Sequence, residues 1–280
     1  MYFSDAGNNA VKQWNAASQQ VVTLLWSGLN NPAGVAVDAQ GNVYVADQND
    51  NDTLWRSRAD GSEAARLTPP GMRTYAPNWS PDGTVIAFSA YVPGKGPGAY
   101  TIASGGGIPR RLGDEQAMFG FPLFSPNGTK LVMSDMEANG LAVIDWKTKA
   151  IVRYGTPNGE QWAIWLADGR HVLLFSNGEA VKIDVISGER SVLLRTGRSN
   201  AAYLCSHGDL VYFQVQDQPG QPIYRVPSGG GRPAQVASAN SIPQSDPSRY
   251  EFVALDPSDA PIVSIVRRNS DLYSLELDLP

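Results

Sequence analysis

The sequence is poor in the residues that build reactive sites. Its 280 residues include one cysteine, Cys205, and two histidines, His171 and His207. A single cysteine excludes an intrachain disulfide, and the lack of Cys pairs and of an H-E-x-x-H motif argues against a zinc site. No G-x-S-x-G nucleophile elbow occurs either. We therefore expect no catalytic residues, no cofactor and a protein that is not an enzyme.

Charge and long apolar runs are also scarce. Charged residues make up 18% of the chain, the net charge is −5, and hydrophobic residues make up 42%. The mildly acidic balance argues against nucleic-acid binding, and the hydrophobic content argues against disorder. Because no run of about 18 apolar residues occurs, we expect no membrane insertion. The first ten residues lack the basic and apolar regions of a signal peptide, so none is expected and the compartment stays open.

Glycine and proline are abundant, and much of the glycine belongs to a repeat. An apolar segment, a polar turn and a second apolar segment recur six times, at 35–47, 78–90, 123–135, 164–176, 203–215 and 253–266. Glycine between two apolar runs is a strong hairpin signal, because it adopts positive φ without a Cβ clash. The turn glycines are Gly41, Gly83, Gly128, Gly169 and Gly208, and the sixth copy has Asp259-Ala260 instead.

The period of the repeat indicates a β-propeller. Successive turn glycines are separated by 42, 45, 41 and 39 residues, and strand-only repeats of 40–45 residues are typical of propeller blades. Third strands are expected at 53–58, 99–104, 141–146, 180–185, 223–228 and 271–277, and fourth strands at 65–68, 109–113, 150–155, 191–196 and 233–238. The prediction is an all-β, six-bladed β-propeller of four-stranded antiparallel blades, forming one domain over 1–280 and a monomer.

The sequence allows two ways in which the ends of the chain could close the ring. The sixth blade has only three predicted strands, so residues 19–26 are expected to supply its fourth strand and close the ring. Residues 2–15 also have the pattern of two strands, and these are not needed to close a six-bladed ring. The alternative is a propeller of seven blades with a truncated one at the N-terminus.

Two parts of the chain resemble different propeller families. The segments SDAGNNAVKQWN (4–15) and LNNPAGVAVDAQGNVYVAD (29–47) resemble bacterial NHL repeats. From residue 53 on, segments such as NWSPDGTVIAFSA and FSPNGTKLVMSD resemble the WD-like SPDG repeats of TolB-like propellers. The terminal NSDLYSLELDLP resembles the end of TolB-like sensor propellers fused to bacterial kinases. The resemblance implies a bacterial, extracytoplasmic origin.

The change of repeat type near residues 48–53 suggests a chimera. On this hypothesis the chain joins an NHL-like segment, 1–50, to a TolB-like segment, 53–280, and is a non-enzymatic scaffold or binding module without a dedicated native activity. One alternative is a natural extracytoplasmic sensor or protein-interaction propeller. The other is an enzyme centred on the propeller channel, similar to lactonases or lyases.

The loops that enter first strands and join second to third strands usually carry recognition in propellers. Aromatic residues and arginine, which dominate interface hot spots, occur in these loops. The candidate residues for a protein or small-ligand partner at this top face are Asn31, Arg73, Tyr75, Tyr91, Phe119, Trp162, Arg249 and Tyr250. The competing interpretation is that Tyr75, Phe119 and Trp162 cap the channel or wedge between blades.

A weak metal candidate lies at the seam. Asp47, Asn49, Asn51 and Asp52 offer oxygen ligands that suit a hard cation such as Ca²⁺. The run lacks the glycine at position 6 of an EF-hand loop and the glutamate at position 12. A solvated loop with Asx side chains bonded to the backbone is the favoured interpretation, and no metal is expected.

Overall fold

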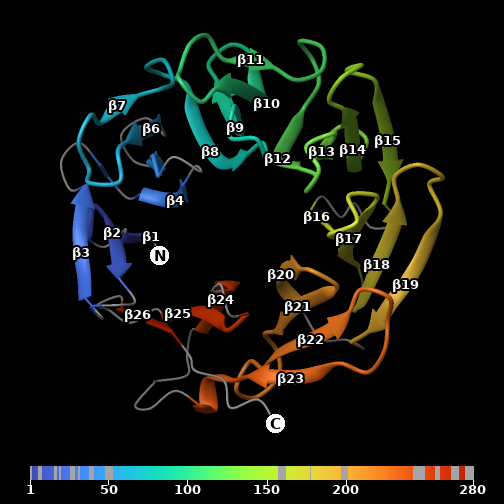
Figure 1. Cartoon of the computed structure of the whole chain (residues 1–280). Coiled ribbons are helices and arrows are strands. Elements are labelled where there is room, and N and C mark those ends of the chain that lie inside the picture. The colour runs from blue at the N-terminus through green and yellow to red at the C-terminus, as the bar shows by residue number, and fades with distance from the viewer. Residues whose placement is uncertain are drawn as a thin grey trace. The chain divides into compact units, whose positions relative to one another are not determined.

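A computed structural model describes residues 2–5, 8–15, 18, 20–25, 29–30, 32–37, 41–47, 53–156, 162–176, 178–196, 201–241, 250–255, 259–265 and 271–274. The chain contains two compact units, residues 1–161 and residues 162–280. Each unit consists of antiparallel sheets joined in chain order (Figure 1). The predicted organisation as one domain stays a prediction.

The described residues of unit 1 form four sheets. The N-terminal sheet has three strands, β1 (Tyr2–Asp5), β2 (Ala10–Asn15) and β3 (Gln20–Leu25). Three four-stranded sheets follow. They are β4 (Pro32–Val37), β5 (Val43–Asp47), β6 (Thr53–Ser57) and β7 (Ala65–Arg66); β8 (Arg73–Trp79), β9 (Val85–Val92), β10 (Gly96–Ala103) and β11 (Arg110–Arg111); and β12 (Phe119–Phe124), β13 (Lys130–Asp135), β14 (Gly140–Asp145) and β15 (Ile151–Gly155).

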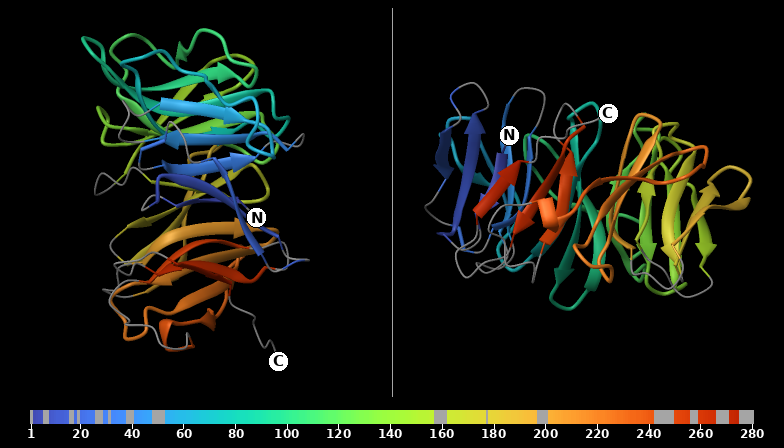
Figure 2. Two further views of the ribbon diagram at one scale, coloured as in Figure 1. Left: turned by 90° about the vertical axis from the view of Figure 1, so that its left-hand side faces the viewer. Right: turned by 90° about the horizontal axis from the view of Figure 1, so that it is seen from below.

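In unit 2 the described residues form three sheets built in the same way. Two have four strands: β16 (Ile164–Trp165), β17 (His171–Ser176), β18 (Glu179–Asp184) and β19 (Arg190–Arg195); and β20 (Ala201–His207), β21 (Leu210–Val215), β22 (Ile223–Pro227) and β23 (Ala234–Ala237). The last sheet has three: β24 (Tyr250–Leu255), β25 (Pro261–Ile265) and β26 (Asp271–Ser274). The strands of each sheet twist along their length, as Figure 2 shows.

The six sheets that carry the six repeats are the six predicted blades, and the all-β propeller prediction is confirmed. Beyond these six blades, the N-terminal strands β1, β2 and β3 form a three-stranded sheet of their own. Strand β3, predicted as the fourth strand of the last blade, pairs with β2 instead. The physical reason is local, since Val11 and Leu25 are buried with Leu29 and Val43 in one apolar cluster.

The hairpin turns have the predicted conformation. The five turn glycines all have positive φ, from 52° at Gly208 to 84° at Gly41, and Asp259 in the sixth copy has a φ of 68°. Polar side chains fix the turn in two successive blades. In the first of them, Asp82 Oδ1 accepts hydrogen bonds from Thr84 N at 3.0 Å and from Ser80 Oγ at 2.6 Å. Asn127 takes the place of Asp82 in the second, with equivalent partners.

First strands share an irregularity that the sequence did not reveal. The register shifts between Tyr75 and Asn78 in β8 and between Gly120 and Leu123 in β12. Inside these bulges two non-glycine residues, Ala76 and Phe121, have positive φ of 50° and 49°. A bulge redirects side chains at the edge of a sheet and is frequent beside functional sites.

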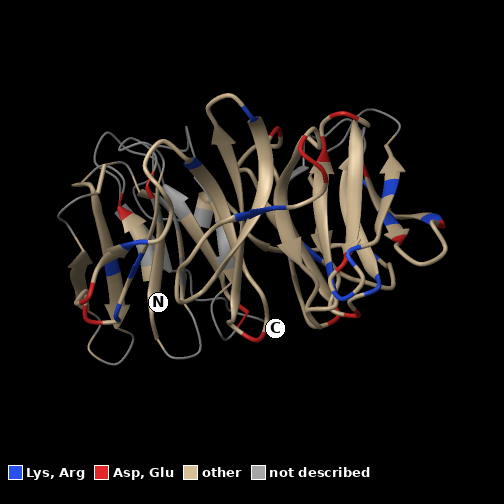
Figure 3. Ribbon diagram, turned by 90° about the horizontal axis from the view of Figure 1, so that it is seen from above, with Lys and Arg blue, Asp and Glu red and all other residues tan. Residues whose placement is uncertain are grey.

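The core of each unit lies on the faces of its sheets. One cluster in unit 1 joins neighbouring blades through Tyr44, Leu54, Ile86 and Phe88, all essentially unexposed. Charged residues are sparse along the strands (Figure 3), because both faces of the middle strands are covered. Helix is nearly absent from the described residues, where η2 (Ala239–Ser241) is a short 3-10 turn. The described residues contain no helix long and apolar enough to cross a membrane.

One turn should make stability depend on acid pH. Asp145 accepts hydrogen bonds from Thr148 N and Thr148 Oγ1, both at 2.9 Å, which lower its pKa from 3.8 to about 2, and Lys130 adds to the effect. Because the pKa of Asp145 is lowered in the folded chain, its ionised carboxylate stabilises the fold above pH 3.8. This contribution is lost as the pH falls toward 2. We expect Asp145→Asn to lose less stability than the wild type between pH 5 and pH 2.5, measured by urea unfolding. Equal losses would contradict this.

Candidate functional site

The β8–β9 strand pair brings together three of the residues predicted for recognition. Arg73 lies directly opposite Tyr91, and Tyr75 lies opposite Ser89 one step further along the same face. Arg73 is exposed, and 44% of Tyr91 is exposed. The neighbouring strand β12 adds Phe121, and Met118, which is 38% exposed, directly precedes that strand. We call the surface formed by Arg73, Tyr75, Tyr91, Met118 and Phe121 the β8/β12 edge.

Two aromatic rings anchor the β8/β12 edge. Tyr75 and Phe121 meet edge to face, with ring centroids 5.6 Å apart. Partial burial raises the pKa of the Tyr75 hydroxyl, so Tyr75 is neutral at physiological pH and can donate or accept a hydrogen bond. Phe121 N donates a hydrogen bond of 2.6 Å to Ser89 Oγ in the adjacent sheet. The two bulges are thus tied to each other across the boundary between blades.

Phe119, also predicted for recognition, lies in the core. It is 1% exposed and belongs to the apolar cluster that contains Leu131 and Ala142. The Arg153 guanidinium lies 5.5 Å from the Phe119 ring centroid, and Arg153 Nε is 2.8 Å from Asp135 Oδ2. The competing interpretation, a ring wedged into the packing, therefore fits Phe119 better than a contact role.

The remaining predicted contact residues fall into two groups. Trp162, at the start of the described part of unit 2, is 65% exposed, which is unusual for a tryptophan. Tyr250 begins β24, and its side chain lies outside the described part of the chain. Asn31 and Arg249 also lie outside the described residues.

Of the four residues of the weak metal candidate, the structure describes Asp47 alone. Asp47 is fully buried at the end of β5, and its Oδ1 accepts a hydrogen bond of 2.7 Å from Asn30 N. This contact supports the backbone-bonding interpretation for Asp47. Asn49, Asn51 and Asp52 lie outside the described residues. Within the described ranges, no group of three or more His, Cys, Asp or Glu side chains is arranged to hold a metal ion.

The two histidines lie beside turns. His171 Nδ1 is 2.6 Å from Asp168 Oδ2, and Asp168 Oδ1 also accepts hydrogen bonds from Arg170 N and His171 N. His207 pairs with Asp259. Each histidine thus has an acidic partner in a hairpin turn, as expected for residues that flank hairpins.

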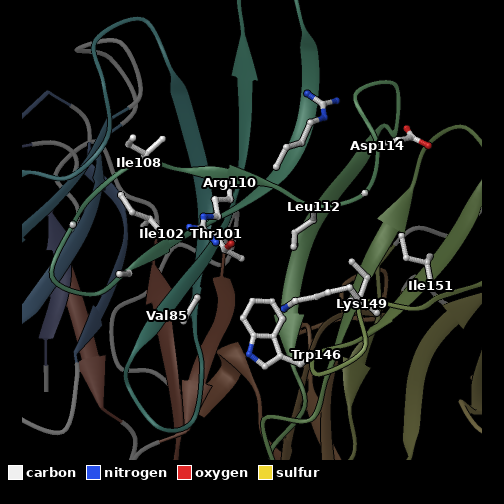
Figure 4. A pocket seen from close by; sticks show the side chains of 15 residues that line it. Val85, Thr101, Ile102, Ile108, Arg110, Leu112, Asp114, Trp146, Lys149 and Ile151 are labelled. Atoms are coloured by element: carbon white, nitrogen blue, oxygen red, sulfur yellow. The ribbon is translucent and has the colours of Figure 1, made fainter.

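Sequence reasoning missed a groove between two blades of unit 1. It has a volume of about 790 Å³ and lies between β10–β11 and β14–β15, with Ile108, Arg110, Trp146 and Lys149 among its lining residues (Figure 4). A second hollow of about 480 Å³ lies on the other side of β11. Ile108 and Arg111 line both. The sequence signal was the run Gly105-Gly106-Gly107 before a short fourth strand, which we interpreted only as a turn.

Comparison with known proteins supports the fold. The NHL repeat family model matches residues 29–56. The match continues past the proposed seam at 48–53, so NHL-type sequence is not confined to 1–50. Residues 48–52 lie outside the described structure, and the chimera hypothesis stays a prediction.

A curated relative is the "uncharacterized peptidase YuxL" of Bacillus subtilis, which is 25% identical over 173 residues, 62% of this chain. The chain spans about a quarter of the length of that relative. A solved streptogramin B lyase structure is 13% identical and has a TM-score of 0.72 over 99% of this chain and 89% of its own. TolB from Acinetobacter baumannii is 15% identical, with a TM-score of 0.57 over 82% of this chain and 60% of its own. Together with the sheets described above, these likenesses make the chain a β-propeller that carries an NHL repeat.

Proposed function

We propose that this propeller is a non-catalytic binding module that contacts a protein partner through the β8/β12 edge. The observation that carries the proposal is the pairing of exposed Arg73 with exposed Tyr91, beside the fixed rings of Tyr75 and Phe121. Tyrosine, arginine and methionine are enriched in the centres of protein interfaces. Such residues gathered at one end of two strands form a small amphipathic patch.

The rigidity of the edge supports the same proposal. Positive φ at a non-glycine residue costs of the order of 1–3 kcal/mol and persists only where surrounding contacts enforce it. Here Ala76 and Phe121 both adopt it, and the hydrogen bond from Phe121 N to Ser89 Oγ secures the second bulge. A surface fixed before binding loses less conformational entropy when a partner docks.

The likeness to known proteins leaves the activity open, since one fold hosts many functions. The similar proteins include a streptogramin B lyase and TolB. A lactonase-like or lyase-like enzyme therefore stays the alternative, and a natural interaction propeller and a chimeric scaffold stay two explanations of the chain's origin. Our preference for binding depends on the β8/β12 edge, where contact-type side chains are exposed.

Affinity capture followed by mass spectrometry tests the proposal. We expect the wild-type chain to retain one or more proteins from a bacterial extract that the double variant Arg73→Ser/Tyr91→Ser does not retain. The control is Glu189→Ser/Arg190→Ser, which alters two exposed residues outside the edge, at the turn between β18 and β19. Identical sets of proteins on all three chains would argue against this edge as a contact surface. The purified candidate is then titrated against each variant.

A further inference from the structure

The groove between β10–β11 and β14–β15 is open because its outer wall is short. Strand β11 comprises only Arg110 and Arg111, which pair with Thr101 and Tyr100 of β10. The chain before it passes through three glycines, so no side chain fills the space beside Ala103 and Gly106. The volume of about 790 Å³ lies within the range of small-molecule pockets in proteins, about 300–1,000 Å³.

The floor of the groove is apolar. It is formed by side chains from both blades: Val85, Ile102, Leu112, Ile144, Trp146 and Ile151. Ile108 stands at the rim with 87% of its surface exposed, the most exposed of the large hydrophobic side chains that the structure describes. The hollow therefore offers contact to a ligand with an apolar, preferably flat, body.

Positively charged side chains of the two blades lie on opposite sides of this apolar floor. Arg110 projects from β11, and its guanidinium has no hydrogen-bond or ion-pair partner among the described residues. Lys149, in the turn between β14 and β15, lies over the Trp146 ring with Nζ 3.1 Å from the ring centroid (Figure 4). Burial lowers the pKa of Lys149, which shows that part of its hydration is lost. Arg111, which also lines the groove, is bonded to Tyr100 Oη, Pro97 O and Ala117 O, so Arg110 and Lys149 are the cations that a ligand can engage.

The nearby carboxylates are already engaged. Asp114, at one end of the groove, accepts hydrogen bonds from Gln116 N and Ala117 N through Oδ1. Asp145 accepts from Thr148 and lies within 3.5 Å of Lys130 Nζ. Asp145 attracts Lys149 electrostatically, but neither carboxylate forms an ion pair with Arg110 or Lys149 within the described structure, so both cations can still approach an added anion.

From these contacts we infer that the groove binds a small aromatic carboxylate, with its ring against Ile108 and the apolar floor and its carboxylate held by Arg110 and Lys149. This site is distinct from the β8/β12 edge and does not depend on the proposed function. A neutral ligand of the same shape would gain the apolar contact alone. An amine of the same shape would meet two like charges.

Isothermal titration calorimetry with three matched probes tests the inference. The probes are 1-naphthylacetate, the neutral 1-naphthylacetamide and the cationic 1-naphthylethylamine, each titrated into the full chain at low salt. We expect the carboxylate to bind at least about tenfold more tightly than the amide, because the amide cannot form charge-assisted hydrogen bonds with the two cations. The amine should bind more weakly than either, because the same cations repel it. No binding of the carboxylate, or equal affinity for carboxylate and amide, overturns the inference.

Charge-removing variants locate the binding. Arg110→Gln and Lys149→Asn should each weaken carboxylate binding at least about fivefold and leave amide binding within twofold. Asparagine is chosen because Lys149 has a φ of +62°, which asparagine tolerates. The control is Lys147→Gln, which removes an exposed cation from the same turn but not from the groove. An effect of Lys147→Gln as large as that of Arg110→Gln would mean that only the general charge of the chain matters, and the site would be rejected.

Discussion

Phe88→Ala is expected to lower the free energy of unfolding by about 3–5 kcal/mol, the usual cost of removing a buried phenylalanine. Phe88 is fully buried in the middle of β9. Its ring stacks on Tyr100 at a centroid distance of 6.1 Å and belongs to the cluster that joins two blades through Tyr44 and Leu54. Strand β9 also carries Ser89 and Tyr91, so the cavity would loosen the base of the β8/β12 edge.

Denaturant unfolding followed by circular dichroism measures this effect. Hydrogen exchange measured by mass spectrometry shows which segments the substitution destabilises. We expect the amides of β8–β11 to lose protection first. Tyr91→Ala is the matched control, since it shortens an aromatic side chain on the same strand but at an exposed position. We expect the control to stay within about 0.5 kcal/mol of the wild type. A loss for Phe88→Ala below about 1 kcal/mol would mean that the two blades do not depend on this ring.

The repeat made the blades predictable. Glycine at a hairpin turn, flanked by apolar runs, specifies both the turn and the two strands, and the predicted third strands agree with β6, β10, β14, β18, β22 and β26 to within a few residues. The residues 2–15 were correctly expected to form two strands. Their partner was harder to foresee, because strand pairing depends on which apolar faces meet in three dimensions. Burial of Val11 and Leu25 together decides it in favour of β2 with β3.

The details of the candidate sites could not be predicted from the repeat. Positive φ at Ala76 and Phe121 has no sequence signal, since neither residue favours that conformation. Arg73 and Tyr91 are 18 positions apart, and their pairing follows from the register of β8 and β9. The groove depends on the shortness of β11 and on side chains from two blades, none of which is unusual by itself. Phe119 was left with two interpretations, because an aromatic residue at a strand start suits either a surface or a core, and its burial fits the core.

Polar residues in second strands repeat a contact between blades. Ser89 Oγ accepts from Phe121 N in unit 1, and Gln214 Oε1 accepts from Phe252 N at 3.0 Å in unit 2. Ser89 and Gln214 hold the same position of the repeat, opposite the residue that precedes the bulge. In β12, where Phe121 lies inside the bulge, the side-chain oxygen thus satisfies a backbone N–H that the bulge removes from its own ladder, which explains why a buried polar residue is stable there.

Gly140→Ala should destabilise the chain by about 1–3 kcal/mol or more, the usual range for overpacking. A Cβ at Gly140 would lie 2.3 Å from the carbonyl oxygen of Tyr154 and 3.0 Å from the Cα of Gly155. Both are backbone atoms of β15, so no side-chain rotation relieves the clash, and β15 must move away from β14. That movement would also shift Ile151 and the wall of the groove.

Gly155→Ala is the internal control, because Gly155 lies directly opposite Gly140 and a Cβ there meets nothing within 4 Å. Both substitutions reduce the freedom of the unfolded chain by the same amount, which alone would stabilise by about 0.4–1 kcal/mol. The difference between the two variants therefore isolates the clash. We expect Gly155→Ala to be neutral or slightly stabilising and Gly140→Ala to be clearly less stable, measured by urea unfolding of both variants. Equal stabilities would show that β15 can move away from β14 without cost.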